Sequence, residues 1–423
     1  DLPSLDPEQD TGTICPFVQG LPWTIRSAID FRARGVELIS PVLRLGRHAD
    51  EPSTGWKELA GMLGVGMGRM KRALKRAGFM QDSFRNALRK RGEEILREVE
   101  RGRTCLLLVG RPYNAMDPGL NMDLSQKLRR QGILGLPLDF LPLEEEGHRI
   151  SGENMYWGYG QKILAAAHFL RRYPNLHPVF VTNFSCGPDA FILHFFQDIL
   201  GDRPFLELEI DEHTADAGVV TRLEAFWDSI RGSGDKKREA RAPKRANLGY
   251  RADRVLYIPP MTDHLKAFTA AFAAQGVDAR LLPESDRDSL ALGRKHTTGK
   301  ECLPAVLTTG DILKATQEPD FDPDRAAFFM PASNGPCRFG LYHRLHSLLL
   351  DKMGFSGAQV YAPNQTYTLY EELGVVGKDF AKQAWKGVVA VDLLLKIRQE
   401  TRPYVQDRAA CDRLYNEYLD RIS

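Results

Sequence analysis

The chain has 423 residues, enough for two or three domains with substantial cores. Its 57 basic and 55 acidic side chains leave a formal charge of only +2, which argues against a dedicated nucleic-acid-binding protein. No apolar run reaches the roughly 18 residues of a membrane span, and the first residues lack the pattern of a signal peptide. Six cysteines without a CxxC pair do not form a disulfide scaffold in a chain this long, so a reducing cytoplasm is expected.

Residues 1–103 are predicted to be a mostly helical segment. Cys15-Pro16 precedes an expected helix near 21–31, and Gly55–Arg101 is largely helical and rich in lysine and arginine. Interleaved glutamates indicate a solvated helical surface, and a surface for an acidic partner or a phosphate-bearing ligand is the alternative. Because the first residue is Asp1 rather than Met, a piece of a longer polypeptide is also expected.

Residues 104–231 alternate between apolar strands and helices. The expected strands are Cys105–Val109, Leu134–Leu138, Val179–Thr182 and Phe205–Ile210. Continuous apolar runs of this kind are typical of strands buried on both faces of a parallel sheet. The alternation therefore predicts a first Rossmann-like α/β domain.

Residues 232–254 interrupt this pattern. They are rich in Gly, Ser, Lys and Arg and lack apolar periodicity, which predicts a basic linker. The alternation then resumes over 255–423, with expected strands Val255–Ile258, Ala279–Leu282, Ala327–Met330 and Gln359–Tyr361. The predicted fold class is α/β: two Rossmann-like parallel-sheet domains facing each other, with an additional helical N-terminal segment and C-terminal helices.

Four of the six cysteines lie in Gly- or Pro-containing turns near expected helix starts: Cys15, Cys186, Cys302 and Cys337. At Cys302, the polar, turn-like residues 296–299 come first and Pro304 suits the first turn of the helix that follows. A helix N-terminus stabilises a thiolate, the form that a nucleophile or a metal ligand requires. Cys105 and Cys411 are predicted to be core cysteines.

The spacing of these cysteines leaves three interpretations open. Structural zinc sites usually show close pairs of ligands, which this chain lacks. Dispersed cysteines beside Gly and Pro suit an iron–sulfur cluster, whose sulfur atoms accept hydrogen bonds from nearby backbone N–H groups. Buried cysteines without a function and a catalytic thiol are the other two interpretations.

Polar groups at expected strand ends are further candidates. Asp211, Glu212 and His213 offer a general base, and the alternative is a capped helix start. Arg338, beside Cys337, is placed to donate to cluster sulfides or to a thioester carbonyl, and the alternative is a surface ion pair.

Three more residues have two interpretations each. Arg111 suits a phosphate, although Gly-Arg-Pro is also an ordinary turn. His343 and His346, spaced by three on an expected helix, either face the site or belong to the core.

Seven short strings along the chain share a family pattern. They are Cys15-Pro-Phe-Val-Gln, Val109-Gly-Arg-Pro-Tyr113, Tyr156-Trp157 with Lys162-Ile-Leu-Ala-Ala166, Asn183-Phe-Ser-Cys-Gly-Pro-Asp189, Glu209-Ile-Asp-Glu-His-Thr-Ala-Asp-Ala-Gly218 with Thr221-Arg222, Lys300-Glu-Cys-Leu-Pro304 and Gly335-Pro-Cys-Arg338. In this order they resemble the cluster-binding region of large acyl-CoA dehydratase activase proteins, which is related to 2-hydroxyacyl-CoA dehydratase subunits.

The resemblance implies a [4Fe-4S] cluster held between two Rossmann-like domains. Carried over position by position, its ligands are Cys186, Cys302 and Cys337, and Cys15 is the candidate for a fourth. Four ligands would close the cluster and favour electron relay, whereas three would leave one iron for a substrate. The resemblance also implies an ATPase partner, an activase of the sugar-kinase/actin fold, which delivers low-potential electrons.

The leading hypothesis is thus an oxygen-sensitive iron–sulfur protein that uses such electrons for radical reduction or dehydration. Arg338, Glu212 and His213 are its candidate catalytic residues. Whether it is itself a dehydratase or a component of an ATP-dependent reductase stays open. The rival hypotheses are a non-catalytic relay or assembly module that docks to further subunits, and a metal-free α/β enzyme with Cys302 as the nucleophile.

Overall fold

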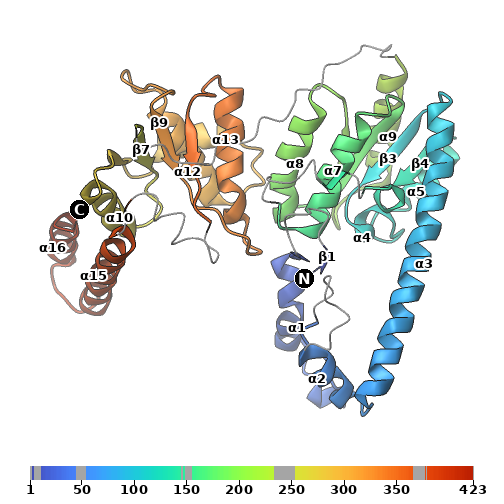
Figure 1. The fold of residues 1–423 in the computed structure, drawn as a ribbon, viewed down its shortest axis with the longest axis horizontal. Coiled ribbons are helices and arrows are strands. Elements are labelled where there is room, and N and C mark those ends of the chain that lie inside the picture. Colours follow the sequence, from blue (N-terminus) through green and yellow to red (C-terminus); the bar gives the residue numbers. More distant parts are fainter. Residues whose placement is uncertain are drawn as a thin grey trace. The chain divides into compact units, whose positions relative to one another are not determined.

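The computed structural model describes residues 2–3, 11–43, 54–143, 146–147, 155–232, 253–364, 377 and 379–422. The chain divides into two compact units, unit 1 (Asp1–Lys244) and unit 2 (Arg245–Ser423). Figure 1 colours unit 1 from blue to green and unit 2 from yellow to red. Most of the predicted linker 232–254 lies outside the described residues. No helix within the described ranges is long and apolar enough to cross a membrane.

The N-terminal part of unit 1 is mainly helical. Its elements are β1 (Leu2–Pro3), β2 (Thr11–Gly12), α1 (Pro16–Ala28), the 3-10 helix η1 (Arg32–Arg34), α2 (Thr54–Met62) and α3 (Met67–Glu100). The long α3 is exposed over most of its first two thirds and buries Ile95, Leu96 and Val99 near its end. Gly92 of α3 packs against the backbone of Phe140. A Cβ at Gly92 would lie 2.0 Å from the Phe140 carbonyl oxygen.

A four-stranded parallel sheet forms the centre of unit 1, in the order β4-β3-β5-β6. Its strands are β3 (Cys105–Val109), β4 (Leu134–Pro137), β5 (Leu176–Asn183) and β6 (Leu206–Ile210). The connecting helices are α4 (Pro112–Ala115), α5 (Leu124–Arg130), the 3-10 helix η2 (Leu138–Phe140), α7 (Gly158–Leu170), α8 (Gly187–Leu200) and α9 (Asp216–Gly232). Every residue of β3 is buried, as expected for a strand covered on both faces.

Alternate residues along β5 face different helices. Val179 and Val181 belong to a core with residues of α5 and α9, whereas the Phe180 ring packs edge-to-face on Phe196 of α8. The alternation follows from the two-residue period of a strand. Unit 1 is therefore a sheet between two helical layers (Figure 1).

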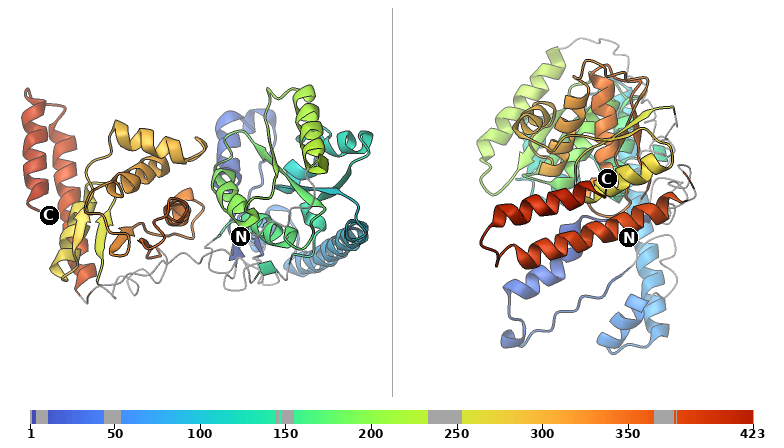
Figure 2. Two further views of the ribbon diagram at one scale, coloured as in Figure 1. Left: turned by 90° about the horizontal axis from the view of Figure 1, so that it is seen from above. Right: turned by 90° about the vertical axis from the view of Figure 1, so that its left-hand side faces the viewer.

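Unit 2 contains a second four-stranded parallel sheet, in the order β10-β9-β7-β8. Its strands are β7 (Val255–Ile258), β8 (Ala279–Leu281), β9 (Ala326–Phe329) and β10 (Gln359–Tyr361). Its helices are α10 (His264–Ala274), α11 (Arg287–His296), α12 (Leu303–Ala315), the 3-10 helix η4 (Arg338–Leu341), α13 (Tyr342–Lys352), α15 (Phe380–Thr401) and α16 (Arg408–Asp420). Phe272, Phe329 and Phe380 pack together where α10 and α15 cover the sheet. The helices α15 and α16 lie side by side (Figure 2).

Both sheets have the same strand order. If the four strands of each sheet are numbered 1 to 4 along the chain, their order across the sheet of unit 1 is 2-1-3-4 (β4-β3-β5-β6). The sheet of unit 2 has the same order, 2-1-3-4 (β8-β7-β9-β10). The predicted α/β fold with two parallel-sheet domains is confirmed. In such sheets the connection after strand 1 leads toward one edge of the sheet and the connection after strand 3 leads toward the other edge. Ligands bind between these two connections, at the carboxyl ends of strands 1 and 3.

The structure corrects the expected turn before Cys302. His296, predicted to lie in a polar turn, is the last residue of α11. Asp286 caps this helix by accepting a hydrogen bond from the Ser289 backbone N–H at 2.8 Å. The sequence did not predict α11 because the helix has no apolar periodicity: its buried residues are Ser289 and Gly293, which pack against α12.

Candidate functional site

Each of the four cysteines singled out from the sequence is the N-cap of a helix. Cys15 precedes α1, Cys186 precedes α8, Cys302 precedes α12 and Cys337 precedes η4, which leads into α13. The first N–H groups of a helix have no partner within the helix. A sulfur at the N-cap therefore lies beside backbone donors and the positive end of the helix dipole.

In unit 1, Cys186 follows the carboxyl end of β5. The preceding residue, Ser185, has a φ of 54°, in the left-handed region that few non-glycine residues adopt. The turn is closed by the Cys186 N–H, which donates to the Asn183 carbonyl at 3.1 Å. This backbone directs the chain from the end of the strand into α8.

The N-terminal strand brings Cys15 to the same unit. Thr13 forms a parallel bridge with Trp157, and the Gly158 N–H donates to the Thr13 carbonyl at 3.2 Å. The approach is close, since a Cβ on Gly12 would lie 2.8 Å from the Cα of Gly158. Cys15, two residues after Thr13, is thereby anchored next to the start of α7.

A buried arginine contacts the Cys186 sulfur. The Arg111 Nη1 atom lies 3.3 Å from Cys186 Sγ and 2.8 Å from both carboxylate oxygens of Asp189. The Thr182 hydroxyl also donates to Asp189, at 2.5 Å. Burial opposes the charged guanidinium, but the adjacent Asp189 carboxylate outweighs this effect and raises the pKa of Arg111.

Burial also raises the pKa of Cys186, to about 11, with a further contribution from Asp189 that Arg111 opposes. The metal-free thiol is therefore protonated at neutral pH. Binding of a metal at this sulfur would displace a proton.

Tyr113 relates the two cysteines of unit 1 to each other. Burial raises its pKa, Arg111 lowers it, and ionisation of Cys186 or Cys15 would raise it further. We name Cys15 and Cys186 the unit 1 pair.

Unit 2 has a matching arrangement around Tyr342. The Tyr342 hydroxyl lies 2.6 Å from Cys302 Sγ, and this tyrosine is 4% exposed. Its pKa is raised by burial, by the hydrogen bond with Cys302 and by negative charge on Cys302 and Cys337, whereas Arg338 lowers it. We name Cys302 and Cys337 the unit 2 pair.

The two pairs occupy corresponding places in the two sheets. Cys186 and Cys337 each lie between the third strand of their unit and the helix after it. Cys302 is the N-cap of α12, the helix before the third strand of unit 2. Cys15 lies two residues after Thr13, which pairs with Trp157, the N-cap of the corresponding helix α7. Each unit therefore has two candidate cysteines at helix N-termini, and Cys186 and Cys337 follow the third strand of their sheet, where α/β sheets bind ligands.

Each unit by itself contains two of the four candidate cysteines. None of the six cysteines of the chain forms a disulfide. Among the described residues, no group of three or more His, Cys, Asp or Glu side chains is placed to hold a metal ion. The thiols, the helix N-termini and the buried Arg111 donor do suit the chemistry of an iron–sulfur cluster.

Of the predicted catalytic residues, Glu212 and His213 lie on an exposed turn after the edge strand β6. Their side chains are 81% and 85% exposed and approach each other to 3.7 Å. Asp211 accepts hydrogen bonds from the Thr214 hydroxyl and the His213 N–H, and the bond from Thr214 is the main cause of its lowered pKa. These bonds stabilise the turn ahead of α9, and the Glu212 and His213 side chains extend into solvent.

Arg338 is half-buried at the start of η4, within electrostatic reach of Tyr342. His343 and His346 are completely buried, and burial lowers the pKa of each to about 3. Both histidines therefore belong to the core of unit 2 and are neutral at physiological pH.

The sequence did not reveal two contacts of the site. One is the Arg111–Asp189 pair, which joins the loop after strand 1 to the helix after strand 3. Its only sequence signal is an arginine and a carboxylate at the ends of two expected strands. The other is the Tyr342–Cys302 contact, which bridges 40 residues and has no local signal.

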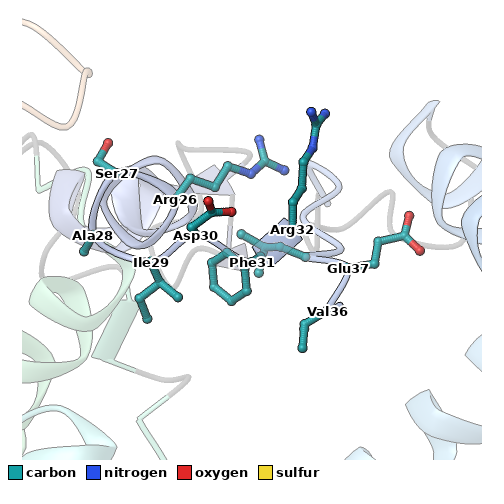
Figure 3. Close-up of a pocket in the computed structure, with 10 residues that line it drawn as sticks. Arg26, Ser27, Ala28, Ile29, Asp30, Phe31, Arg32, Val36 and Glu37 are labelled. Carbon is teal, nitrogen blue, oxygen red and sulfur yellow. The ribbon is translucent and has the colours of Figure 1, made fainter. Parts of the chain in front are cut away.

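A separate open pocket of about 980 Å³ lies at the far end of α1 from Cys15. Figure 3 shows Arg26 and Arg32 extending to one side of it and Ile29 and Val36 to the other. Since α1 has 13 residues, its two ends are about 20 Å apart. This pocket is therefore distinct from the unit 1 pair.

Fold and site together define an α/β protein with a cysteine pair at the ligand-binding edge of each of two parallel sheets. Residues 2–141 match the family model described as the CoA enzyme activase uncharacterised domain. This match supports the relation to the acyl-CoA dehydratase activases that the sequence strings predicted. The matched region includes Cys15, Arg111 and Tyr113. No curated protein and no solved structure matches the chain.

Proposed function

We propose that this protein binds a [4Fe-4S] cluster and carries low-potential electrons in an acyl-CoA dehydratase/activase system. The observation that supports the proposal is the repeated cysteine pair, present at corresponding places in two sheets with the same strand order. The match of residues 2–141 to a CoA enzyme activase domain supports the same system.

In this proposal the unit 1 pair and the unit 2 pair together supply four thiolate ligands, the usual number for such a cluster. When bound, the cluster supplies one-electron chemistry that amino-acid side chains lack. The helix N-termini behind the four sulfurs and the Arg111 guanidinium stabilise negative charge on the ligands.

Four ligands favour electron relay over substrate activation. Cys15 corresponds in position to Cys302, so we infer that it ligates and that no iron is left for a substrate. The electron donor is an ATPase activase of the sugar-kinase/actin fold, as the family resemblance implies, and the acceptor is a catalytic subunit of the same system. We infer a reducing cytoplasm as the location of this protein, because thiols stay reduced there.

The alternative of a metal-free enzyme has less support. A nucleophilic Cys302 needs a base to remove its proton. The group in contact with its sulfur is the Tyr342 hydroxyl, and the raised pKa of this buried phenol makes it a hydrogen-bond donor rather than a base.

The ligands are tested by anaerobic cluster reconstitution followed by iron and sulfide analysis and electron paramagnetic resonance spectroscopy. We expect four iron atoms per chain in the unmodified protein, and a loss of most of the iron in Cys302→Ala. We expect Cys15→Ala to change the resonance spectrum, because one iron loses its thiolate. Cys411→Ala, on helix α16, is the matched control and should load normally.

Three outcomes contradict the proposal in different ways. An unmodified protein without iron overturns it. A Cys15→Ala variant with an unchanged spectrum and full iron content shows three-cysteine ligation and favours a catalytic cluster. Single-site alkylation of Cys302 that abolishes an activity of the iron-free protein would favour the metal-free enzyme.

A further inference from the structure

The two cysteine pairs differ in the hydrogen-bond donor that reaches their sulfurs. In unit 1 the donor to Cys186 is a guanidinium, Arg111, at 3.3 Å. In unit 2 the group in contact with Cys302 is a neutral phenol, Tyr342, at 2.6 Å. Two otherwise matching sites are therefore electrostatically unequal.

Arg111 has little freedom to move. It is 6% exposed, and a single guanidinium nitrogen, Nη1, contacts both the Asp189 carboxylate and the Cys186 sulfur. Asp189 is 2% exposed and is itself held by the Thr182 hydroxyl of β5.

The backbone beneath Arg111 is equally constrained. Gly110 lies against β5, where a Cβ would stand 2.6 Å from the Val181 carbonyl oxygen. Strands β3 and β5 are neighbours in the sheet, so the arginine at the end of one reaches the cysteine after the other. The contact is a product of the strand order and needs no rearrangement to form.

A buried ion pair of this kind is costly unless it has further partners. A hydrophobic pair of similar volume often stabilises a protein at least as well, so stability alone is a weak reason for its presence. Because the Arg111–Asp189 pair lies against the Cys186 sulfur, we infer that it acts on this sulfur.

We propose that Arg111 is a positioning residue that raises the reduction potential of the cluster through its hydrogen bond to the Cys186 sulfur. This inference rests on the proposed function. Adding an electron makes the cluster and its ligands more negative, and a fixed cationic donor at a ligand stabilises that reduced state. Asp189 also contacts Cys186, where its charge opposes that of Arg111, and it holds the guanidinium in place.

The test is the midpoint potential of the reconstituted full-length protein, measured by a reductive titration that is followed by electron paramagnetic resonance. Removing Arg111 alone would leave Asp189 buried and unpaired, so the main variant is the neutral pair Arg111→Gln with Asp189→Asn. We expect its potential to fall by about 59 mV or more, a tenfold change in the ratio of reduced to oxidised cluster.

A second variant, with a more conservative substitution, keeps the proposal testable if the neutral pair fails to fold. Arg111→Lys retains the charge but replaces the guanidinium, whose Nη1 contacts both partners, with a shorter ammonium side chain, so its potential should fall by less than that of the neutral pair. Tyr342→Phe removes a neutral donor and should also shift the potential less.

The matched control is Arg203→Lys. Arg203 is another partly buried arginine of unit 1, but it donates to the carbonyl oxygens of Leu170 and Leu176, at the opposite end of β5. This variant should lose stability without changing the potential.

The outcomes separate this inference from the proposed function. A protein that binds no iron overturns both. A loaded protein whose potential is unchanged in both the neutral pair and Arg111→Lys overturns the role of Arg111 and leaves the cluster in place. A shift of the same size in Arg203→Lys would show a merely structural effect and would also overturn it.

Discussion

At the scale of single residues, the chain contains several buried titratable groups whose pKa values reflect their surroundings. Burial raises the pKa of Cys105, the first residue of β3, to about 12, so this thiol is inert, as predicted for a core cysteine. Burial lowers the pKa of His177 on β5 to about 4. His343 and His346 on α13 have still lower values, about 3.

These histidines predict loss of stability in acid. Their pKa values in the folded protein lie below the ordinary value of 6.5, so between pH 6.5 and about 3 only the unfolded chain binds the extra protons. Each histidine should therefore cost about 1.4 kcal/mol of unfolding free energy per pH unit below 6.5. The contribution of these neutral, buried histidines to the free energy of unfolding is complete above pH 6.5 and is lost as the pH falls toward their folded-state pKa values.

The two units should respond unequally, because α13 of unit 2 has two such histidines and β5 of unit 1 has one. His343 faces Arg344 and His346, and His346 faces Thr308 and Tyr342. Hydrogen exchange followed by peptide mass spectrometry at pH 7.5 and 5.5 measures each unit within the full chain. Equal loss of protection in both units, or none in unit 2, would contradict this explanation.

At the scale of elements, α3 shows how one helix combines two environments. Its first two thirds are largely exposed and basic, as the interpretation of Gly55–Arg101 as a solvated helical surface predicted. Its end packs on η2, where Gly92 meets the Phe140 backbone with no room for a side chain. By contrast, a Cβ on Gly78 of the same helix would meet nothing within 4 Å.

The two glycines predict opposite effects of the same substitution. Gly92→Ala should lower the free energy of unfolding by about 1–3 kcal/mol, because the added methyl must displace backbone. Gly78→Ala should raise it by about 0.5–1 kcal/mol, because glycine is a poor helix former in an open position. Urea unfolding followed by circular dichroism measures both, and a Gly92→Ala variant as stable as Gly78→Ala would disprove the close packing.

At the scale of the whole molecule, the proposed ligands are divided equally between two units. Cys15 and Cys186 belong to unit 1, and Cys302 and Cys337 belong to unit 2. A cluster bound by all four would be a covalent link between them. Loading and unit association should therefore depend on each other.

This dependence is testable with a protease site introduced into the predicted linker 232–254. After cleavage, the loaded protein should elute from an anaerobic gel-filtration column as one species, and treatment with an iron chelator should separate the two pieces. The double variant Cys15→Ala with Cys186→Ala removes both unit 1 ligands and should separate the pieces without a chelator. Pieces that separate equally well with and without iron would place all the ligands in one unit.

The sequence by itself determined the alternation of strands and helices. All eight strands of the two sheets were predicted, because buried parallel strands are short continuous apolar runs that stand out between amphipathic helices. The helix starts at Cys186 and Cys302 were equally predictable from the prolines beside them. The helix after Cys15 was expected near 21–31, but α1 begins at Pro16. Helix α11 was missed because its polar face outweighs the little that it buries.

Only the tertiary structure decided which residues meet. The sequence cannot show that β3 and β5 are neighbours, and this adjacency alone brings Arg111 to Asp189 and Cys186. Nor does it show that Thr13 pairs with Trp157, which gives Cys15 the place that Cys302 holds in unit 2. Local periodicity depends on neighbouring residues along the chain, whereas these contacts depend on strand order, a property of the whole sheet.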